Sequence, residues 1–148
     1  MTMIYGSRAV VERHESGVLD TSTYIDLDQL DPAALPMLPD ITVITMAELH
    51  QGVAMAKTPA IRAVRTEKLG AAIVDFDPLP FDDGAAARYG TLVALVLSAN
   101  RDPRPRRMDL MIAAIASSRG LPLYTRSEED FQNLDTMITV IRIAASVL

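Results

Sequence analysis

The chain has 148 residues, 49% of them apolar, and its 19 acidic and 14 basic residues give a net charge of −5. This size and composition predict one domain with a sizeable core and exclude a chain that is disordered throughout. Cysteine is absent and histidine occurs twice, which excludes a disulfide scaffold, a zinc finger, a thiol enzyme and an iron–sulfur site. We expect neither a membrane span nor a secretory signal, and therefore a soluble cytoplasmic protein. Because the charge is negative, nucleic acid can be bound only through a local basic patch or through metal ions.

The chain after its first residues alternates between short apolar runs and longer helical patterns. Residues 1–16 are polar and weakly periodic, and we interpret them as an N-terminal arm or a remnant of expression that precedes a single domain over 17–148. Short apolar runs are typical of buried strands. Five such runs predict strands at 17–20, 41–44, 71–76, 121–125 and 137–143.

Helices are predicted in the gaps between these strands. Thr45 and Glu48 form a Thr-x-x-Glu capping box, and Thr58-Pro59 places a capping residue before a proline at the first helical position. Further helices are predicted over 82–98 and 108–120. The last of these is apolar nearly all round, which predicts a buried helix. The alternation favours a three-layer α/β fold, with a central, mostly parallel, five-stranded sheet covered by helices on both faces.

Four acidic residues are predicted at one edge of this sheet. Asp20 ends the first strand, Glu48 lies in the first turn after the second, Asp109 lies in the first turn of the apolar helix, and Asp130 follows the fourth strand. Carboxyl ends of parallel strands and amino ends of the following helices share one edge, where ligands bind. Convergent carboxylates without histidine or cysteine suit Mg²⁺ or Mn²⁺. The chemistry that such a site supports is metal-assisted phosphoryl transfer.

Three of these acids also have a purely structural explanation. Asp20 is a suitable cap for a following helix. Glu48 and Asp130 are each placed as the return arm of a capping box, opposite Thr45 and Ser127 respectively. Asp109 is harder to explain in this way, because it lies at the head of a buried helical stripe, where a carboxylate needs a partner.

A run of arginines comes directly before the apolar helix. Basic residues at the amino end of a helix oppose its dipole, so another role is expected for them. A phosphate backbone passing the acidic edge would supply one, and a solvated loop or a contact with an acidic partner is the alternative. The residues predicted to bind RNA phosphates are Arg104, Arg106, Arg107 and, beside the fourth strand, Arg126.

Four segments in this order resemble a PIN domain, and more specifically the VapC-type toxins of bacterial toxin–antitoxin pairs. They are VLDTSTYIDL (18–27), ITVITMAELHQG (41–52), RRMDLMIAAIASSRGLPLYTRS (106–127) and EEDF (128–131), followed by a closing strand. The resemblance covers roughly residues 17–143. It departs from the family at Ser127, where Asn or Asp is often found, and in the 16 residues before the first strand.

The resemblance implies a metal-dependent endoribonuclease that acts as a toxin, with Mg²⁺ or Mn²⁺ as cofactor. It also implies a homodimer and a cognate VapB-like antitoxin, whose C-terminal segment covers the acidic edge and inserts an arginine or lysine there. Asp20, Glu48 and Asp109 match the three core acids, and Asp130 matches a fourth acid whose position varies. Small hydroxyl positions near the metal are matched by Thr21, Ser22 and Thr125.

Other classes of protein share an α/β fold with a carboxylate edge. A phospho-accepting receiver domain needs an acidic pair after the first strand and a lysine after the last, and this chain has neither. A haloacid-dehalogenase-like phosphatase needs an aspartate two residues after Asp20, where Ser22 stands. A PIN-like module that has lost catalysis and only binds a partner stays open. RNA cleavage that EDTA abolishes would separate it from the nuclease.

Overall fold

A four-stranded parallel sheet forms the centre of the molecule. The computed structural model describes residues 14–144, and the strands are β1 (Ser16–Leu19), β2 (Leu38–Asp40), β3 (Leu123–Thr125) and β4 (Val140–Arg142), in the order β2-β1-β3-β4. Every neighbouring pair is parallel. Of the predicted arm, residues 1–13 lie outside the described residues, whereas Ser16 already pairs with Leu38. The strand therefore begins one residue before the predicted start of the domain.

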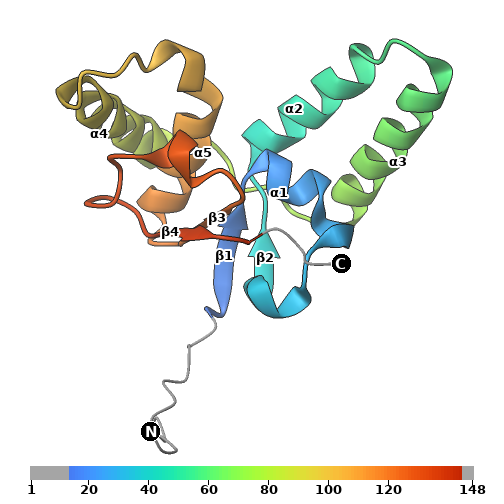
Figure 1. The fold of residues 1–148 in the computed structure, drawn as a ribbon, viewed down its shortest axis with the longest axis horizontal. Helices are drawn as coiled ribbons and strands as arrows, with labels where there is room; N and C mark the ends of the chain where they lie inside the picture. The colour runs from blue at the N-terminus through green and yellow to red at the C-terminus, as the bar shows by residue number, and fades with distance from the viewer. Residues whose placement is uncertain (1–13, 145–148) are drawn as a thin grey trace, which may run out of the picture.

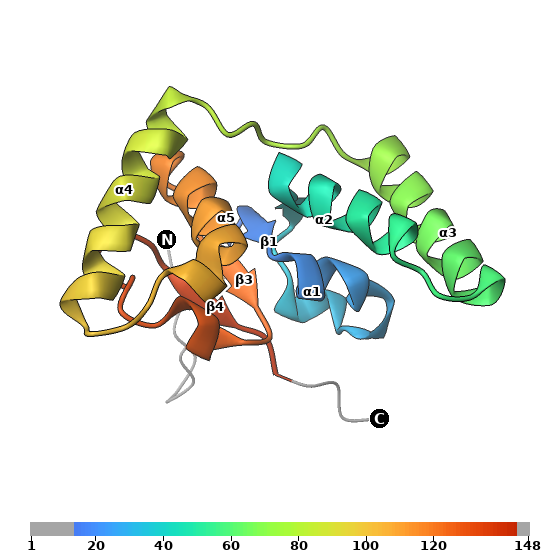
Figure 2. The same ribbon diagram turned by 90° about the horizontal axis from the view of Figure 1, so that it is seen from above.

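Within the described part of the chain, five α-helices surround this sheet. They are α1 (Thr21–Ile25), α2 (Val43–Ala54), α3 (Pro59–Asp75), α4 (Asp83–Ser98) and α5 (Arg107–Ser118), with 3-10 turns η1 (Leu27–Gln29), η2 (Pro32–Ala34), η3 (Arg104–Arg106) and η4 (Glu128–Phe131). Figures 1 and 2 show α4 and α5 together on one side of the molecule and the α2–α3 pair on the other, with β1 between them. Between residues 14 and 144, none of the helices is sufficiently long and apolar to cross a membrane.

The three layers follow from the alternation of side chains along the strands. Val18 belongs to a buried cluster with α4 and α5, and the next residue, Leu19, belongs to a second cluster with α1, α2 and α3. Leu123 and Tyr124 on β3 divide in the same way. Successive residues of a strand point to opposite faces, so each face of the sheet is covered by its own helices. The predicted three-layer α/β fold is confirmed.

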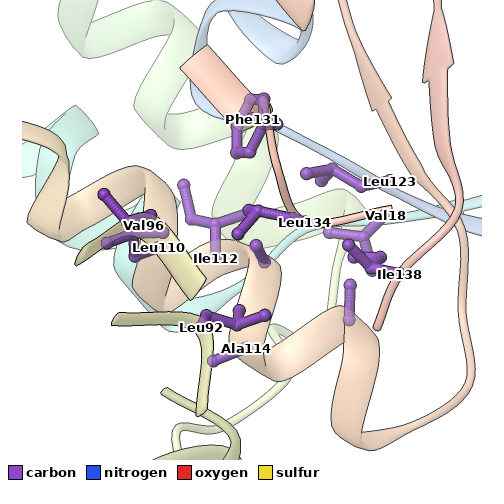
Figure 3. Packing of buried hydrophobic residues seen from close by; sticks show 12 residues of the cluster. Val18, Leu92, Val96, Leu110, Ile112, Ala114, Leu123, Phe131, Leu134 and Ile138 are labelled. Atoms are coloured by element: carbon purple, nitrogen blue, oxygen red, sulfur yellow. The ribbon is translucent and has the colours of Figure 1, made fainter. Parts of the chain in front are cut away.

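Helix α5 is the buried helix that the sequence predicts. Seven of its residues are buried: Leu110, Ile112, Ala113, Ala114, Ile115, Ala116 and Ser117. Figure 3 shows Leu110, Ile112 and Ala114 among side chains of α4 and of the segment after η4. The helix ends before Gly120, whose φ of +67° is the left-handed conformation that favours glycine. The helix begun by Thr58 is also confirmed, because its hydroxyl accepts a hydrogen bond from the Ile61 amide at 3.1 Å.

The predicted strand at 41–44 is wrong, and so is the helix start at Thr45. Strand β2 ends at Asp40, and the Thr42 hydroxyl accepts a hydrogen bond from the Thr45 amide at 3.2 Å, so that Thr42 is the cap of α2. Thr42 retains one isolated parallel bridge, to Leu79. A threonine cap therefore overrides the strand preference of the β-branched residues that follow. Glu48 consequently lies in the second turn of the helix and not in a capping box.

The predicted strand at 71–76 is also wrong, because these residues form the last turns of α3. Only Ala72 in this stretch is buried, whereas Ile73 is 55% and Val74 is 83% exposed. The apolar run predicts a buried strand, but its residues lie mostly in contact with solvent. The sheet has four strands and not five because two of the predicted strands are helical and β2 lies just before the predicted one.

Gly17 allows β1 to pass directly beneath an aromatic ring. A Cβ at this position would lie 2.5 Å from Cε1 of Tyr124 and 3.3 Å from Cβ of Pro36. We expect Gly17→Ala to destabilise the protein by about 1–3 kcal/mol through overpacking. Gly70→Ala is the matched control, since a Cβ there meets nothing within 4 Å and should stabilise helix α3 by about 0.5–1 kcal/mol. Urea unfolding measures both; equal stabilities of Gly17→Ala and wild type would contradict the packing argument.

Candidate metal centre

Asp20 lies at the carboxyl end of β1, where the chain turns directly into α1. Its side chain is 4% exposed. One carboxylate oxygen accepts hydrogen bonds from the Thr23 amide at 3.1 Å and the Ser22 hydroxyl at 3.4 Å. The other oxygen accepts one from the Thr125 hydroxyl of β3 at 2.6 Å. The structure therefore gives Asp20 its capping role in full, and also fixes its carboxylate at the edge of the sheet.

Glu48 is tied to the same edge through Thr21. The Thr21 hydroxyl donates a hydrogen bond to Oε1 of Glu48 at 2.7 Å, and its oxygen lies 2.9 Å from the hydroxyl oxygen of Thr45. Thr21 follows Asp20 in the chain, so this contact links α2 to the end of β1. Sequence reasoning did not assign Thr45 to the site, although a residue three positions before Glu48 lies on the same helix face.

Asp109 lies in the first turn of α5, and among the described residues no side chain donates a hydrogen bond to it. The pKa of its carboxyl is raised to about 6, first by partial burial and then by the negative charges of Asp130, Asp20 and Glu48 in that order, while Arg106 opposes the increase. Electrostatic interactions weaken with distance. The influence of all three carboxylates on Asp109 therefore indicates that the four predicted acids lie on the same side of the molecule.

Asp130 is held by an ion pair and not by a capping box. Its Oδ1 accepts a hydrogen bond from Nη1 of Arg106 at 3.4 Å. Ser127 precedes η4, but its side chain makes no capping hydrogen bond, and its amide donates to the Thr125 hydroxyl at 2.9 Å. The structural alternative for Asp130, a return arm opposite Ser127, is therefore not what the structure shows.

The four arginines predicted to bind phosphate lie in different surroundings. Arg104 is 75% exposed and pairs with Asp102 at 3.0 Å, and Arg107 forms no ion pair with any described residue. Arg126 pairs with Asp26 at 2.7 Å, and its side chain is 27% exposed, close to the 28% of Arg106. Two of the four are thus mainly solvated, and two are partly buried in contacts that join separate elements.

The donor set of this group fits a hard divalent cation. It offers carboxylate and hydroxyl oxygens and no nitrogen or sulfur ligand, which is the preference of Mg²⁺ and Mn²⁺. Within residues 14–144 no three acidic side chains are already arranged around a common point as a metal cage. Mg²⁺ commonly keeps several waters and uses one or two carboxylates, so a closed cage is not required. A cation would also relieve the repulsion that raises the pKa of Asp109.

Taken together, the fold and the site define a parallel α/β protein with carboxylates grouped at the carboxyl edge of its sheet. Ribonuclease VapC5 from Mycobacterium tuberculosis (strain ATCC 25618 / H37Rv) is 41% identical to this chain over an alignment of 133 residues, which covers 86% of this chain and 96% of that protein. At this identity and coverage the relationship is one of family, and the chain belongs to the VapC family. A comparison with protein-family models finds no match.

Solved structures show the same fold. A chain in the crystal structure of VapBC-5 from Mycobacterium tuberculosis, a member of the VapBC family of toxin–antitoxin systems, superposes with a TM-score of 0.76 at 41% identity, covering 88% of this chain and 99% of that one. A chain of FitAcB from Neisseria gonorrhoeae gives a TM-score of 0.64 at 27% identity, covering 84% of this chain and 96% of its own length. The similarity thus extends over nearly the whole length of both relatives.

Proposed function

We propose that this protein is a Mg²⁺- or Mn²⁺-dependent endoribonuclease that acts as the toxin of a toxin–antitoxin pair. The observation that carries the proposal is the carboxylate of Asp109, which is partly buried, accepts no hydrogen bond from a side chain of residues 14–144, and interacts with the charges of Asp20, Glu48 and Asp130. Such a group is costly unless a cation binds it. The name of the 41% identical relative, a ribonuclease, supports RNA as the substrate.

Each side chain of the group has a distinct part in this proposal. Asp20, Glu48 and Asp109 would hold the cation, and Asp130 would assist them. Thr125 and Ser22 fix the carboxylate of Asp20, while Thr21 fixes that of Glu48. When bound, the metal lowers the pKa of a water molecule and stabilises charge on the phosphate. The protein groups keep the acids oriented, so that little reorganisation is needed during the reaction.

The RNA backbone is proposed to contact the exposed arginines. Among the predicted phosphate-binding arginines that form ion pairs, Arg104 has the most exposed side chain. Its ion pair with Asp102 lies at the surface, where such pairs contribute little to stability and are readily exchanged for another partner. Arg107 forms no ion pair with any residue of the described range 14–144. Both flank the start of α5, close to Asp109. Guanidinium groups suit phosphate because they present several donors in one plane.

The antitoxin is proposed to occupy a groove beside the acids. A groove of about 880 Å³ lies between α1, α2 and α3, with Thr21 and Glu48 in its lining. Three apolar side chains of its lining, Met55, Ile61 and Val64, are 64%, 41% and 69% exposed. Neighbouring cationic groups are Lys57, Arg65 and Lys68. An apolar segment in the groove would place an arginine or lysine at the acids and so block the site, and the similarity to the VapBC-5 toxin–antitoxin structure supports such a partner. The homodimer implied by the resemblance stays a prediction.

Cleavage of bulk RNA by the purified chain tests the proposal. We expect fragments in the presence of Mg²⁺ or Mn²⁺, complete loss of cleavage with excess EDTA, and recovery when the metal is restored, because the acids alone cannot activate water.

Addition of a VapB-like antitoxin should stop cleavage, and Val64→Glu should weaken this inhibition by placing a charge in the groove. A chain that binds its antitoxin but never cuts RNA would be the catalytically silent module.

A further inference from the structure

Two arginines from the loop between α4 and α5 meet at one main-chain carbonyl. Nη1 of Arg106 donates to the Glu129 carbonyl at 3.3 Å and to Oδ1 of Asp130 at 3.4 Å. Nη2 of Arg101 reaches the same carbonyl at 3.5 Å, and its Nη1 donates to Oδ1 of Asn133 at 3.3 Å. The two guanidinium groups therefore span the segment 129–133, which carries the fourth acid of the site.

The other side of this segment is fixed by the core. Phe131 is 3% exposed and Leu134 is fully buried, and both pack against α5 and its neighbours (Figure 3). Asn133 adopts the left-handed conformation with a φ of 73°, and Arg101 bonds to its side chain. The segment is thus held on its inner side by apolar packing and on its outer side by hydrogen bonds from the two arginines. Asp130 lies within the part of the chain that these two sets of contacts fix.

The position of Arg106 differs from that expected of a phosphate ligand. Its side chain is 28% exposed, against 75% for Arg104 in the same loop. Its charge also acts on Asp109, where it opposes the three surrounding carboxylates. A guanidinium that is partly buried and already bonded to two acceptors has fewer donors to offer to RNA.

We propose that Arg106, assisted by Arg101, is a positioning residue that fastens segment 128–133 to the start of α5 and so holds Asp130 at the acidic group. The proposal rests on the nuclease function proposed above only for its effect on the reaction; the fastening itself does not depend on it. The clamp gives two of the basic residues before the amino end of α5, Arg101 and Arg106, a role despite the helix dipole.

Hydrogen–deuterium exchange tests the fastening without any activity. We expect Arg106→Gln to speed exchange of the amides of 128–133 by roughly tenfold, because a charge-assisted contact to this segment is lost. Both contacts use a single nitrogen, so the ammonium of Arg106→Lys should keep exchange within about twofold of wild type. Arg104→Gln is the matched control, because Arg104 forms its ion pair with Asp102 in the same loop and not with segment 128–133. Exchange of the amides of 128–133 in this variant should equal that of wild type. Unchanged exchange in Arg106→Gln would overturn the clamp.

A double-mutant cycle with Asp130→Asn tests the effect on RNA cleavage. If Arg106 acts through Asp130, Arg106→Gln should lower kcat roughly tenfold in the wild-type background and by less than about twofold in Asp130→Asn. Arg104→Gln should instead raise KM for RNA by the same factor in both backgrounds. An equal rise in KM with Arg106→Gln in both backgrounds would make Arg106 a direct phosphate ligand and overturn its positioning role. If the wild-type chain cuts no RNA, the proposed function fails while the exchange experiment still decides the clamp.

Discussion

Asp109→Asn should lower the rate of RNA cleavage by roughly 10²-fold or more, and Asp20→Asn by at least as much. Each change keeps the shape of the side chain and removes one negative charge from the group of four acids. Asp109 interacts electrostatically with the other three carboxylates, so we expect its charge to be essential for binding a divalent cation. Initial rates on RNA with saturating Mg²⁺ or Mn²⁺ measure the effect.

A matched variant separates the loss of this site from a general loss of charge. Asp135→Asn makes the same charge change on an exposed side chain near Pro122 and Thr139, at the opposite end of the strands. It should cleave RNA at the wild-type rate. Circular dichroism has to show that Asp20→Asn and Asp109→Asn are folded. Rapid, metal-dependent cleavage by folded Asp109→Asn would refute the assignment of the site.

The same Asp109→Asn variant should be more stable than the wild type at neutral pH and without metal. The pKa of Asp109 is raised from 3.8 to about 6 in the folded state. Between about pH 4 and pH 6 the folded chain thus binds more protons than the unfolded chain, and stability from this group is lost as the pH rises through that range. At pH 7.5 the ionised carboxylate costs roughly 1–2 kcal/mol, after allowance for the water that still reaches it.

Urea unfolding at two pH values in EDTA checks the sign and the size of this effect. The stability gain of Asp109→Asn should be close to its full value at pH 7.5 and should nearly vanish at pH 4, where the carboxyl is protonated in the folded chain. Added Mg²⁺ or Mn²⁺ at pH 7.5 should stabilise the wild type and have much less effect on the variant, because binding to the folded state alone shifts the equilibrium. An equal gain at both pH values would show that the charge of Asp109 is not its cause.

The alternation of strands and helices and the grouping of the acids could be predicted from the sequence. Three predicted strands and the helices begun at Thr58 and Asp82 are local features, since caps and short apolar runs act within a few residues. The acids were predicted to meet because parallel strands end at a common edge, which is a consequence of topology and not of side-chain detail. The coupling of Asp109 to Asp20, Glu48 and Asp130 agrees with that reasoning.

Only the tertiary structure decided which local signal prevails and which side chain contacts which. The apolar residues at 71–76 could equally belong to a buried strand or to an exposed helix, and the structure makes them helical, with Ala72 buried and Phe76 packed against the same cluster. Side-chain partners cannot be predicted from the sequence for a related reason, because they lie far apart in the chain. Arg126 bonds to Asp26, 100 positions away, and Thr125 bonds to Asp20, 105 positions away. A sequence determines which charges are present, but their partners depend on how distant segments are brought together, and that is set by the burial of the two cores on either side of the sheet.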